Sequence, residues 1–582
     1  MKFRWSIAPS QPLLAGQLAR SQNLSPLFAQ CLLNRGLSEP AAIGRYLQPR
    51  LKHLADPFLL PDMSAAVERL FLARQRNETL VIFGDYDVDG VTSTALLLEV
   101  LQPLGWQAEY YLPHRMEEGY GLSPDAVEHC LEKVPATLLL AVDCGSTAAT
   151  TIGELRQRGL DVIVLDHHQV SSPPPPAAAL VNPYRRDAET QNTADSHSGD
   201  SAFRELCSVG LAFKLAHALV KRGRETGLPG AGDFDLRLLL DLVALGTIAD
   251  VVPLTGENRL LTAAGLNRLN ATERPGLVAL KRVAECQASV GVYEAAFQLA
   301  PRLNAAGRLE SAEEALRLLL ARDAAEGLPL AQNLDARNRE RQVLERGITK
   351  QVIEAVEPKF KPETDLVIVE GRSTWHVGVV GIVATRVLQR FYRPTIIVGG
   401  NDLHWRGSGR SIPGFDLADA LRQCSDLLVR HGGHAMAAGV TLEQANLDAF
   451  RKRLNDLARA TLTDAQLQAE LRLDAEVGLD EITLDGVSEL QRLKPIGQGN
   501  PAVHVCARQL THQRPLQRLG TEKQHVKMWV TDRAVTHEAV WWGAGQESLP
   551  VGTFDLAFAP QINQYNGLVS VQLKVLDWIA ST

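Results

Sequence analysis

The stretch TLVIFGDYDVDGVTSTALLLEVL, residues 79–101, predicts a buried strand, an acidic loop and a helix. The apolar run ends at Gly84, and the helix is expected to begin near Val91. Three aspartates occupy alternate positions between them, with no Lys or Arg in the loop: Asp85, Asp87 and Asp89. Like charges about 4 Å apart cost on the order of 4 kcal/mol per pair at an effective dielectric near 20, so a cation or protonation has to offset the repulsion. The alternative is that one aspartate caps the helix and the others are turn residues.

Strands and helices alternate in the residues that follow. The segments TLVIFG, WQAEYYLP, ATLLLAVDCG and LDVIVLDHH are strand-like, and helix-length segments separate them. This order predicts right-handed βαβ units and a parallel sheet covered by helices. The strands are continuously apolar, which indicates that both faces of the sheet are buried. The predicted fold class is therefore α/β.

Acidic and imidazole side chains close more than one of these apolar segments. Asp143 follows the strand TLLLAV, and Asp250 ends the segment LGTIAD. The pair His167 and His168 follows DVIVLD. Parallel strands bring their carboxyl ends to one edge of the sheet, where open α/β sheets bind ligands, so we predict a metal site there. Carboxylates with one or two imidazoles favour Mn²⁺ or Mg²⁺ over a thiolate-bound zinc, and five or more ligands suggest two ions.

The remainder of the chain predicts a second α/β pattern and a small all-β module. A proline run leads into a polar stretch, interpreted as a flexible insertion. A long helix follows, with Leu344, Ile348, Val352 and Val356 four apart on one face. The predicted architecture is two α/β domains joined by a long helix, plus a C-terminal β-module. The predicted segments are 1–70, packing on the catalytic core; 71–310, the catalytic domain, with the insertion at 185–203; 311–360, the connector helix; 361–462, the second α/β domain; and 468–582, the β-module.

Composition limits the class of protein only loosely. The net charge of −7 and the pI of about 6.1 neither support nor exclude a polyanion site. The seven cysteines are scattered without a CxxC pair, which favours a reducing compartment. No apolar run reaches the roughly 18 residues of a membrane span, and no GxGxxG fingerprint follows the first strand. We expect a cytoplasmic protein without membrane association.

Four motifs, in this order, resemble those of the DHH phosphoesterase superfamily: GDYDVDG, VDCG, DHH and IADVVPL. The segments GSGRSIPGFDLADAL and HGGHAMAAGV resemble the C-terminal domain associated with that superfamily, and PRLNAAGR lies between the two groups. The resemblance extends over nearly the whole chain and is strongest to the bacterial single-strand-specific 5′-to-3′ exonucleases. The polar insertion after Tyr184 departs from the pattern, because it lengthens the gap between the His pair and Asp250.

The resemblance implies two-metal hydrolysis of phosphodiester bonds in single-stranded DNA, with release of 5′-mononucleotides, in recombination and repair, mismatch repair included. The implied metal ligands are Asp85, Asp87, Asp143, His167 and Asp250. His168 is expected to steady the scissile phosphate. Asp89 is interpreted as a helix-capping or supporting group.

The resemblance also implies a binding path for the strand. Arg115, Ser408 and Arg410 would form a pocket for the terminal 5′ phosphate, although Arg115 could instead pair with Glu117 or Glu118. Further candidates for strand contact are Arg302, Arg308, Arg372, Trp375, His376, His434 and the arginines of the connector helix. The connector arginines could instead form a solvated helix face. The motif HGGH, which includes His434, could instead form a tight turn. The channel is expected to be too narrow for a duplex. The β-module resembles an OB-fold that binds single strands. Its candidate contacts are Arg514, Arg518, Lys523, Lys527 and Trp529.

The expected partners are single-stranded DNA, a single-strand-binding protein and a RecQ-type helicase, and the expected state is a monomer. Two other functions stay open. One is a DHH enzyme for small substrates, such as a pyrophosphatase or a phosphodiesterase of short oligonucleotides. The other is a catalytically inactive replication scaffold, which the retained acidic cluster argues against.

Overall fold

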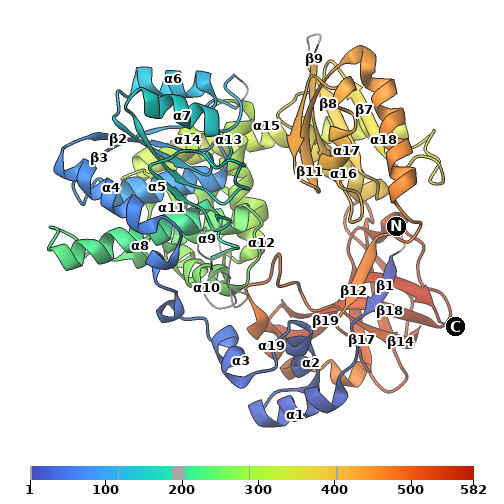
Figure 1. Cartoon of the computed structure of the whole chain (residues 1–582). Coiled ribbons are helices and arrows are strands. Elements are labelled where there is room, and N and C mark those ends of the chain that lie inside the picture. Colours follow the sequence, from blue (N-terminus) through green and yellow to red (C-terminus); the bar gives the residue numbers. More distant parts are fainter. Residues whose placement is uncertain (1–2, 116, 186–202, 287–288, 401–403, 582) are drawn as a thin grey trace. The chain divides into compact units, whose positions relative to one another are not determined.

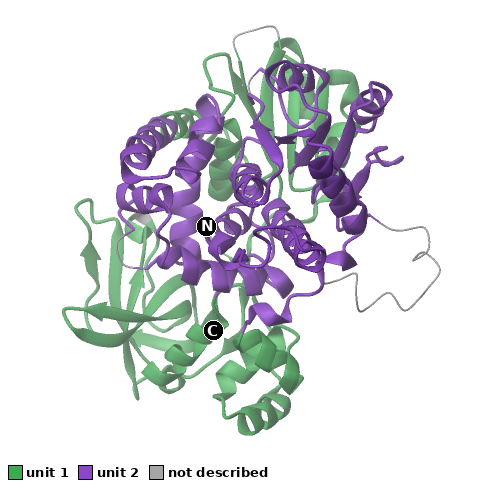
Figure 2. Cartoon of the chain, turned by 90° about the vertical axis from the view of Figure 1, so that its left-hand side faces the viewer, with its two compact units in different colours: residues 1–48, 344–494, 501–582 green, residues 49–343, 495–500 purple. Residues whose placement is uncertain are grey.

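A computed structural model describes residues 3–115, 117–185, 203–286, 289–400 and 404–581 (Figure 1). The chain forms two compact units (Figure 2). One comprises residues 49–343 and 495–500, and the other comprises residues 1–48, 344–494 and 501–582. The predicted insertion at 185–203 lies outside the described residues except for its two ends. No helix of the described residues is long and apolar enough to cross a membrane.

The sheet of the first unit has five parallel strands in the order β3-β2-β4-β5-β6. Leu80 and Ile82 belong to the core on one face of the sheet, and Val81 and Phe83 belong to the core on the other. The prediction of a parallel sheet buried on both faces is therefore confirmed. The strands are β2 (Thr79–Phe83), β3 (Gln107–Tyr111), β4 (Leu138–Val142), β5 (Asp161–Leu165) and β6 (Ala179–Val181).

Helices cover both faces of this sheet. The smaller core contains residues of α6 (Pro124–Lys133) and α7 (Ala149–Gln157). The larger core contains residues of most other helices of the unit, among them α4 (Met63–Gln75), α5 (Val88–Leu101), α8 (Ser208–Thr226), α9 (Leu240–Ala249), α10 (Gly256–Asn270), α11 (Pro275–Val283), the π-helical turn η5 (Ala295–Leu299), α13 (Ala300–Leu309) and α14 (Glu313–Leu319). The strand order reverses between β2 and β4, and ligands bind open α/β sheets outside the carboxyl ends at such a reversal.

The second unit contains a mixed five-stranded sheet in the order β10-β11-β9-β8-β7. One face packs on α16 (Val380–Phe391), and the other packs on α17 (Leu417–Arg422) and α18 (Leu447–Thr461). The strands are β7 (Ile368–Arg372), β8 (Thr395–Gly399), β9 (His404–Arg410), β10 (Arg430–Gly433) and β11 (Ala437–Glu443). This sheet is the second α/β pattern that the sequence predicts.

The C-terminal module is a closed barrel. Its five main strands run in the order β14-β18-β19-β17-β16, and β14 pairs back with β16. Closure removes the exposed sheet edges and gives the five-stranded arrangement of an OB-fold, as predicted. The strands are β14 (Val505–His512), β16 (His525–Thr531), β17 (Thr536–Trp541), β18 (Phe554–Tyr565) and β19 (Leu568–Ala580).

The prediction that residues 1–70 pack on the catalytic core is wrong for residues 1–48. Strand β1 (Arg4–Ile7) pairs in parallel with β12 (Glu470–Leu473), and α2 (Pro26–Asn34) buries Phe28 and Leu32 in the core of the barrel module. Residues from 49 onward belong to the catalytic unit and pack in its core through side chains such as Leu60 and Met63. The edge of β12 offers backbone groups that β1 satisfies, and sequence patterns do not reveal such a distant pairing.

The connector helix is shorter than the predicted segment 311–360. α14 ends at Leu319, and α15 (Ala324–Val356) is a separate helix. The carboxylate of Asp323 accepts a hydrogen bond from the backbone N–H of Glu326 at a distance of 2.9 Å and so caps the start of α15. The predicted apolar face is confirmed, because Ile348, Val352 and Val356 are buried against the second unit's sheet.

Candidate metal centre

The acidic loop lies between β2 and α5, and close packing shapes it. A Cβ atom on Gly90 would lie 2.6 Å from the backbone nitrogen and oxygen of Asp85, so only glycine fits there. The side chain of Asp87 accepts hydrogen bonds from the N–H groups of Asp89, at 2.9 Å, and Gly90, at 3.2 Å. Asp87 is therefore the N-cap of α5, and the capping interpretation is confirmed for one of the three aspartates. The helix begins at Val88, earlier than predicted.

Asp89 caps a different helix. Its buried carboxylate accepts hydrogen bonds from the N–H groups of Ser208, at 2.7 Å, and Val209, at 2.8 Å, in the first turn of α8. The hydroxyl of Ser208 donates to the carboxylate of Asp143 at 2.9 Å. The N-terminus of a helix favours negative charge, so α8 stabilises both carboxylates. The sequence did not indicate this contact, because 119 positions separate Ser208 from Asp89.

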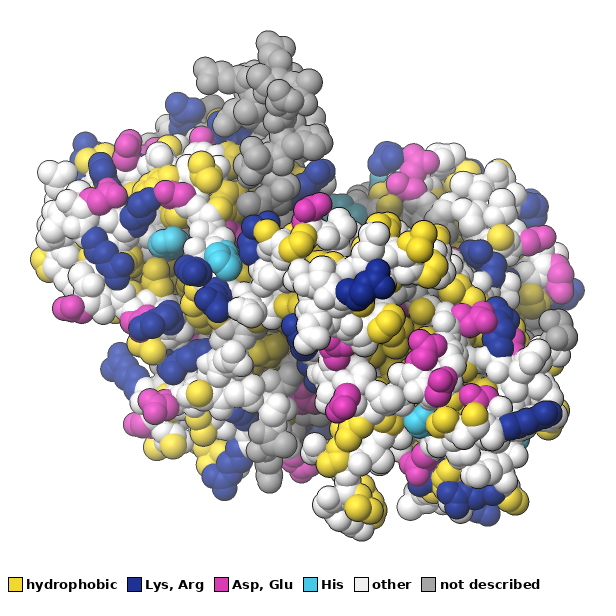
Figure 3. All heavy atoms as spheres, turned by 90° about the horizontal axis from the view of Figure 1, so that it is seen from below, with side chains coloured by type: hydrophobic (Ala, Val, Ile, Leu, Met, Phe, Trp, Pro, Cys, Tyr) yellow, Lys and Arg dark blue, Asp and Glu magenta, His cyan; other side chains and the backbone are white. Residues whose placement is uncertain are grey.

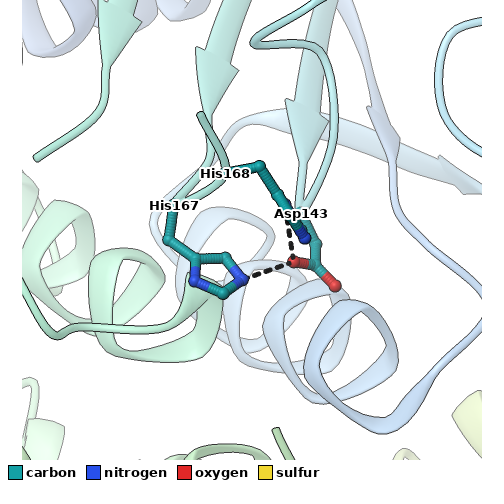
Figure 4. A group of neighbouring side chains, drawn as sticks. All are labelled: Asp143, His167 and His168. Carbon is teal, nitrogen blue, oxygen red and sulfur yellow. Dashed lines mark ion pairs between the residues drawn. The ribbon is translucent and has the colours of Figure 1, made fainter. Parts of the chain in front are cut away.

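His167 points toward Asp143, which follows β4 (Figure 4). Its Nε2 atom lies 3.4 Å from Oδ1 of Asp143, 3.6 Å from Oδ2 of Asp250 and 3.9 Å from Oδ2 of Asp89. The structure thus brings together all six side chains predicted for the catalytic centre. Three groups have ligand atoms within 4.8 Å of one another: Asp85 with Asp87 and Asp143, Asp143 with His167 and His168, and Asp89 with Cys207 and Asp250.

The carboxylates destabilise one another's charged forms. Burial, and then the charge of neighbouring aspartates, raises the pKa of Asp85 and Asp143 well above the usual range. The same causes raise the pKa of Asp89 to about 7 and that of Asp250 to about 9. Among the described residues, Oδ1 of Asp85 and Oδ2 of Asp250 are buried without a hydrogen-bond partner. Buried oxygen atoms that lack a partner in an acidic cluster fit divalent cations such as Mn²⁺ or Mg²⁺.

The backbone is strained at two of these positions. Asp143 has a φ of 65°, and Val251, directly after Asp250, has a φ of 60°. Residues other than glycine rarely adopt this left-handed conformation, and for a β-branched residue it is a true outlier. Such strain is retained where the surrounding structure requires it, most often at functional sites.

Asp166 and His168 form a hydrogen-bonded pair. His168 is one of the predicted site residues, and Asp166 is not. Nδ1 of His168 lies 2.8 Å from Oδ1 of Asp166. Burial acts to raise the pKa of Asp166, but the hydrogen bond and charge of His168 hold it well below the usual range. Burial acts to lower the pKa of His168, but the same pair raises it. The position of Asp166 in the DHH motif, directly before the two histidines, was the available signal.

Three further side chains support this pair and were not predicted. The hydroxyl of Tyr120 lies 3.2 Å from Nδ1 of His168 and donates to the backbone oxygen of Asp143 at 3.1 Å. The amide of Asn182 donates to the backbone oxygen of His168 at 2.9 Å and to the hydroxyl of Ser146 at 2.8 Å. These contacts join separate loops, and only the glycine-flanked Tyr120 gave any local indication.

Two arginines lie near the acidic loop. The guanidinium carbon of Arg115 lies 5.1 Å from the ring centroid of Tyr86. Glu118 accepts hydrogen bonds from Tyr111 and from the N–H of His114, so its carboxylate has partners other than Arg115. Arg308 is half-buried in α13 and contributes to the electrostatic surroundings of Tyr86.

Other candidate arginines are held in ion pairs. Asp335 lies 2.9 Å from the guanidinium of Arg302 and 2.8 Å from that of Arg339. Arg337 lies 2.6 Å from Glu310 and 3.0 Å from Glu314. Arg337 and Arg339 of the connector helix thus have carboxylate partners, although Asp335 is shared by two arginines. Arg341 of the same helix is buried, so the interpretation of a solvated face does not hold for every connector arginine.

Ser408 and Arg410 lie together at the end of β9. Nη1 of Arg410 donates to the hydroxyl of Ser408 at 2.7 Å. A Cβ atom on Gly381, in the first turn of α16, would lie 3.1 Å from that hydroxyl and 3.2 Å from Nη2 of Arg410. Both side chains therefore border the N-terminus of α16, where backbone N–H groups favour an anion.

Other predicted contacts of the second unit have differing surroundings. Arg372 is exposed and lies 5.7 Å from the ring of Trp375, which is buried in the core. His376 accepts a hydrogen bond from the N–H of Gly378 at 3.2 Å. His434 is exposed in the turn between β10 and β11. His431, Gly432 and Gly433 belong to β10 and pair with β11, so the tight-turn interpretation of HGGH is wrong for these three residues.

The barrel places two cations over one aromatic ring. The guanidinium carbon of Arg514 lies 3.6 Å from the ring centroid of Trp529, and Nζ of Lys527 lies 5.2 Å from it. Lys527 also pairs with Glu538 at 2.5 Å. On the face shown in Figure 3, basic, acidic and apolar side chains are interspersed.

Removing a carboxylate should stabilise the metal-free protein. The folded state raises the pKa of Asp250 from 3.8 to about 9, so it binds this proton more tightly than the unfolded state does. The Tm without metal should therefore fall as the pH rises through this range. Asp250→Asn should raise the Tm at pH 8 by about 2–4 °C for each kcal/mol of repulsion removed, and should flatten the pH dependence. Thermal denaturation in EDTA tests this, with the exposed Asp233→Asn as control. A lower Tm for Asp250→Asn would contradict it.

Ser208→Ala should weaken metal binding, because Asp143 would lose its buried hydroxyl donor. Loss of a partner that orients a ligand typically costs 10–100-fold in metal affinity. The measurement is a calorimetric titration with Mn²⁺. Ser93→Ala is the matched control, since the Ser93 hydroxyl is buried and has no hydrogen-bond partner among the described residues. Equal Mn²⁺ affinity in the two variants would refute the role of Ser208.

Three family models match the chain. The DHH family N-terminal domain matches residues 79–247, the DHHA1 domain matches residues 364–460, and the RecJ OB domain matches residues 473–577. The single-stranded-DNA-specific exonuclease RecJ of Bacillus subtilis is 36% identical over 582 residues, which cover 99% of this chain and 71% of the relative.

Solved structures agree. RecJ of Thermus thermophilus in complex with Mn²⁺ is 31% identical, with a TM-score of 0.83 over 100% of this chain and 80% of that chain. The same protein in complex with Mg²⁺ is 29% identical, with a TM-score of 0.76 over 99% of this chain and 78% of that chain. These matches confirm the predicted superfamily and architecture. The chain therefore belongs to the RecJ family of DHH proteins.

Proposed function

We propose that this chain is a metal-dependent exodeoxyribonuclease that hydrolyses single-stranded DNA from the 5′ end. It releases 5′-mononucleotides and acts in recombination and repair, mismatch repair included. The observation that supports this most is the buried cluster of acids at the strand-order reversal, where Asp85 and Asp250 each have a buried oxygen without a hydrogen-bond partner among the described residues. The barrel module favours a polymeric substrate over a small one.

Two Mn²⁺ or Mg²⁺ ions would be held by five side chains. Asp143 belongs both to the group with Asp85 and Asp87 and to the group with His167, so it is the residue placed to contact both ions. When bound, the ions supply an acidified water and neutralise charge on the phosphate oxygens. The ligands of this proposal are Asp85, Asp87, Asp143, His167 and Asp250.

His168 acts on the scissile phosphate. Its pair with Asp166 orients the imidazole through Nδ1, which leaves Nε2 for a phosphate oxygen. The raised pKa of His168 favours the protonated ring, whose N–H donates to an anionic oxygen. Tyr120 and Asn182 maintain this orientation through their hydrogen bonds.

The terminal 5′ phosphate binds Ser408 and Arg410. The support is their position at the N-terminus of α16, where guanidinium, hydroxyl and backbone N–H groups all favour a phosphate. Arg115, on the catalytic unit, offers the strand a guanidinium of its own. The strand beyond contacts Arg308, Arg372, His376 and His434, and Arg302 contributes charge that Asp335 offsets in part.

A nuclease restricted to single strands requires other proteins to open a duplex and to keep the strands apart. We therefore include a RecQ-type helicase and a single-strand-binding protein as working partners of a monomeric cytoplasmic enzyme. The support is the family membership and the named substrate of the relatives.

His167→Ala should abolish hydrolysis. The substitution removes one ligand and leaves Asp143 and Asp250 without the nearby imidazole. Activity on a 5′-phosphorylated single strand with Mn²⁺ should fall by more than the roughly 10–100-fold that loss of a supporting partner causes. His129→Ala, at an exposed histidine paired with Glu118, is the control and should keep full activity. Undiminished hydrolysis by His167→Ala would refute the proposed function.

Arg410→Ala should reduce the preference for a 5′ phosphate. Loss of a charge-assisted hydrogen bond of about 1.5–3 kcal/mol predicts a roughly 10–100-fold drop in the ratio of kcat/KM for 5′-phosphorylated over 5′-hydroxyl strands. Arg422→Ala, which removes an exposed arginine paired with Asp419, should leave the ratio unchanged. The same ratio in wild type and Arg410→Ala would show that the phosphate binds elsewhere.

A further inference from the structure

Two large aromatic side chains are exposed side by side on the catalytic unit. Tyr293 is 63% exposed and Phe297 is 68% exposed. Their ring centroids lie 5.1 Å apart, with an angle of 37° between the ring planes. Single exposed apolar residues are common, but two adjacent exposed rings form a surface that favours a flat apolar partner.

The backbone that presents these rings is firmly held. Tyr293 lies in α12 (Val292–Glu294) and Phe297 in the π-helical turn η5, which continues into α13. Ala295, between the two aromatic residues, and Leu299, just after them, are fully buried in the larger core. The side chain of Glu294 accepts a hydrogen bond from the N–H of Gly291 at 2.8 Å and so caps the start. The rings are therefore preorganised, and π-helical turns are frequent at functional sites.

The other end of the same helical segment touches the acidic loop. The side-chain oxygen of Asn304 accepts a hydrogen bond from the N–H of Val88 at 3.2 Å. A Cβ atom on Gly307 would lie 2.5 Å from the backbone oxygen of Tyr86, so α13 packs directly on the loop. Phe297 precedes Asn304 by seven positions, or about 10 Å along a helix axis. A few nucleotides span that distance at about 3.4 Å or more each.

We propose that Tyr293 and Phe297 form a stacking platform for one base of the substrate strand, a few nucleotides on the 3′ side of the scissile phosphate. The platform holds any of the four bases, because each has a π-face, and so suits an enzyme that shortens strands of any sequence. A base within a duplex is stacked on its neighbours and is not free to lie on these rings, so the platform also favours single strands. This inference rests on the proposed function, since it assigns the rings to the same strand.

The test is strand binding in EDTA, which prevents metal-dependent hydrolysis. Short 5′-phosphorylated single strands each carry one 2-aminopurine, at successive positions from the 5′ end. In the wild type, fluorescence should be quenched most at one internal position. The double variant Tyr293→Ala/Phe297→Ala should lose that maximum and bind about tenfold or more weakly. Leu59→Ala, at a residue 62% exposed in the same unit, is the matched control and should match the wild type.

An abasic nucleotide at the quenched position provides the second measurement. It should weaken binding by the wild type about as much as the double substitution does, and it should weaken the double variant no further. Of two single variants, Phe297→Ala should lose part of the quenching, and Phe297→Trp, which keeps an aromatic ring, should retain it. Equal affinity and an identical quenching profile in the double variant and the wild type would overturn the platform.

Hydrolysis is followed separately with Mn²⁺. A wild type that shows the stacking maximum but leaves single strands intact would refute the proposed function and support the platform. A wild type that hydrolyses strands while the double variant keeps the quenching profile would overturn the platform alone.

Discussion

The repulsion among buried carboxylates at the carboxyl edge of β2 and β4 is the constraint on which the rest of the catalytic unit depends. Two helix N-termini oppose it: Asp87 caps α5, and Asp89 accepts hydrogen bonds from the first turn of α8. The same side chains that start these helices thus form part of the acidic cluster. Oδ1 of Asp85 and Oδ2 of Asp250, which cap neither helix, are buried without a hydrogen-bond partner among the described residues, so we expect folding and cation binding to be coupled here.

Local patterns predicted most of this centre. An apolar strand that ends in an acid is visible in a few residues, and parallel strands must bring such ends together, so Asp85, Asp143 and His167 could be assigned before any coordinates. Contacts between distant loops could not be assigned in this way. Ser208 and Asn182 have no distinctive local pattern, and the donors they supply become meaningful only once the sheet is formed.

The basic residues show the opposite outcome. The arginines of the connector helix suggested a strand-binding surface. In the structure, Arg337 pairs with Glu310 and Glu314, and Arg302 of α13 pairs with Asp335. A sequence shows which cations are present, whereas their availability depends on carboxylates that the fold brings near. The segment 1–48 was misplaced for a similar reason, because its docking edge on β12 is remote in the chain.

The pairing of β1 with β12 also constrains the order of synthesis. Arg4 is in register with Glu470, so the first strand leaves the ribosome long before its partner exists. At about 5–20 residues per second, that interval is on the order of half a minute to a minute and a half. During this interval the barrel module that buries Phe28 and Leu32 of α2 has not yet been made. The amino-terminal segment therefore exposes apolar side chains of the kind that chaperones of nascent chains bind.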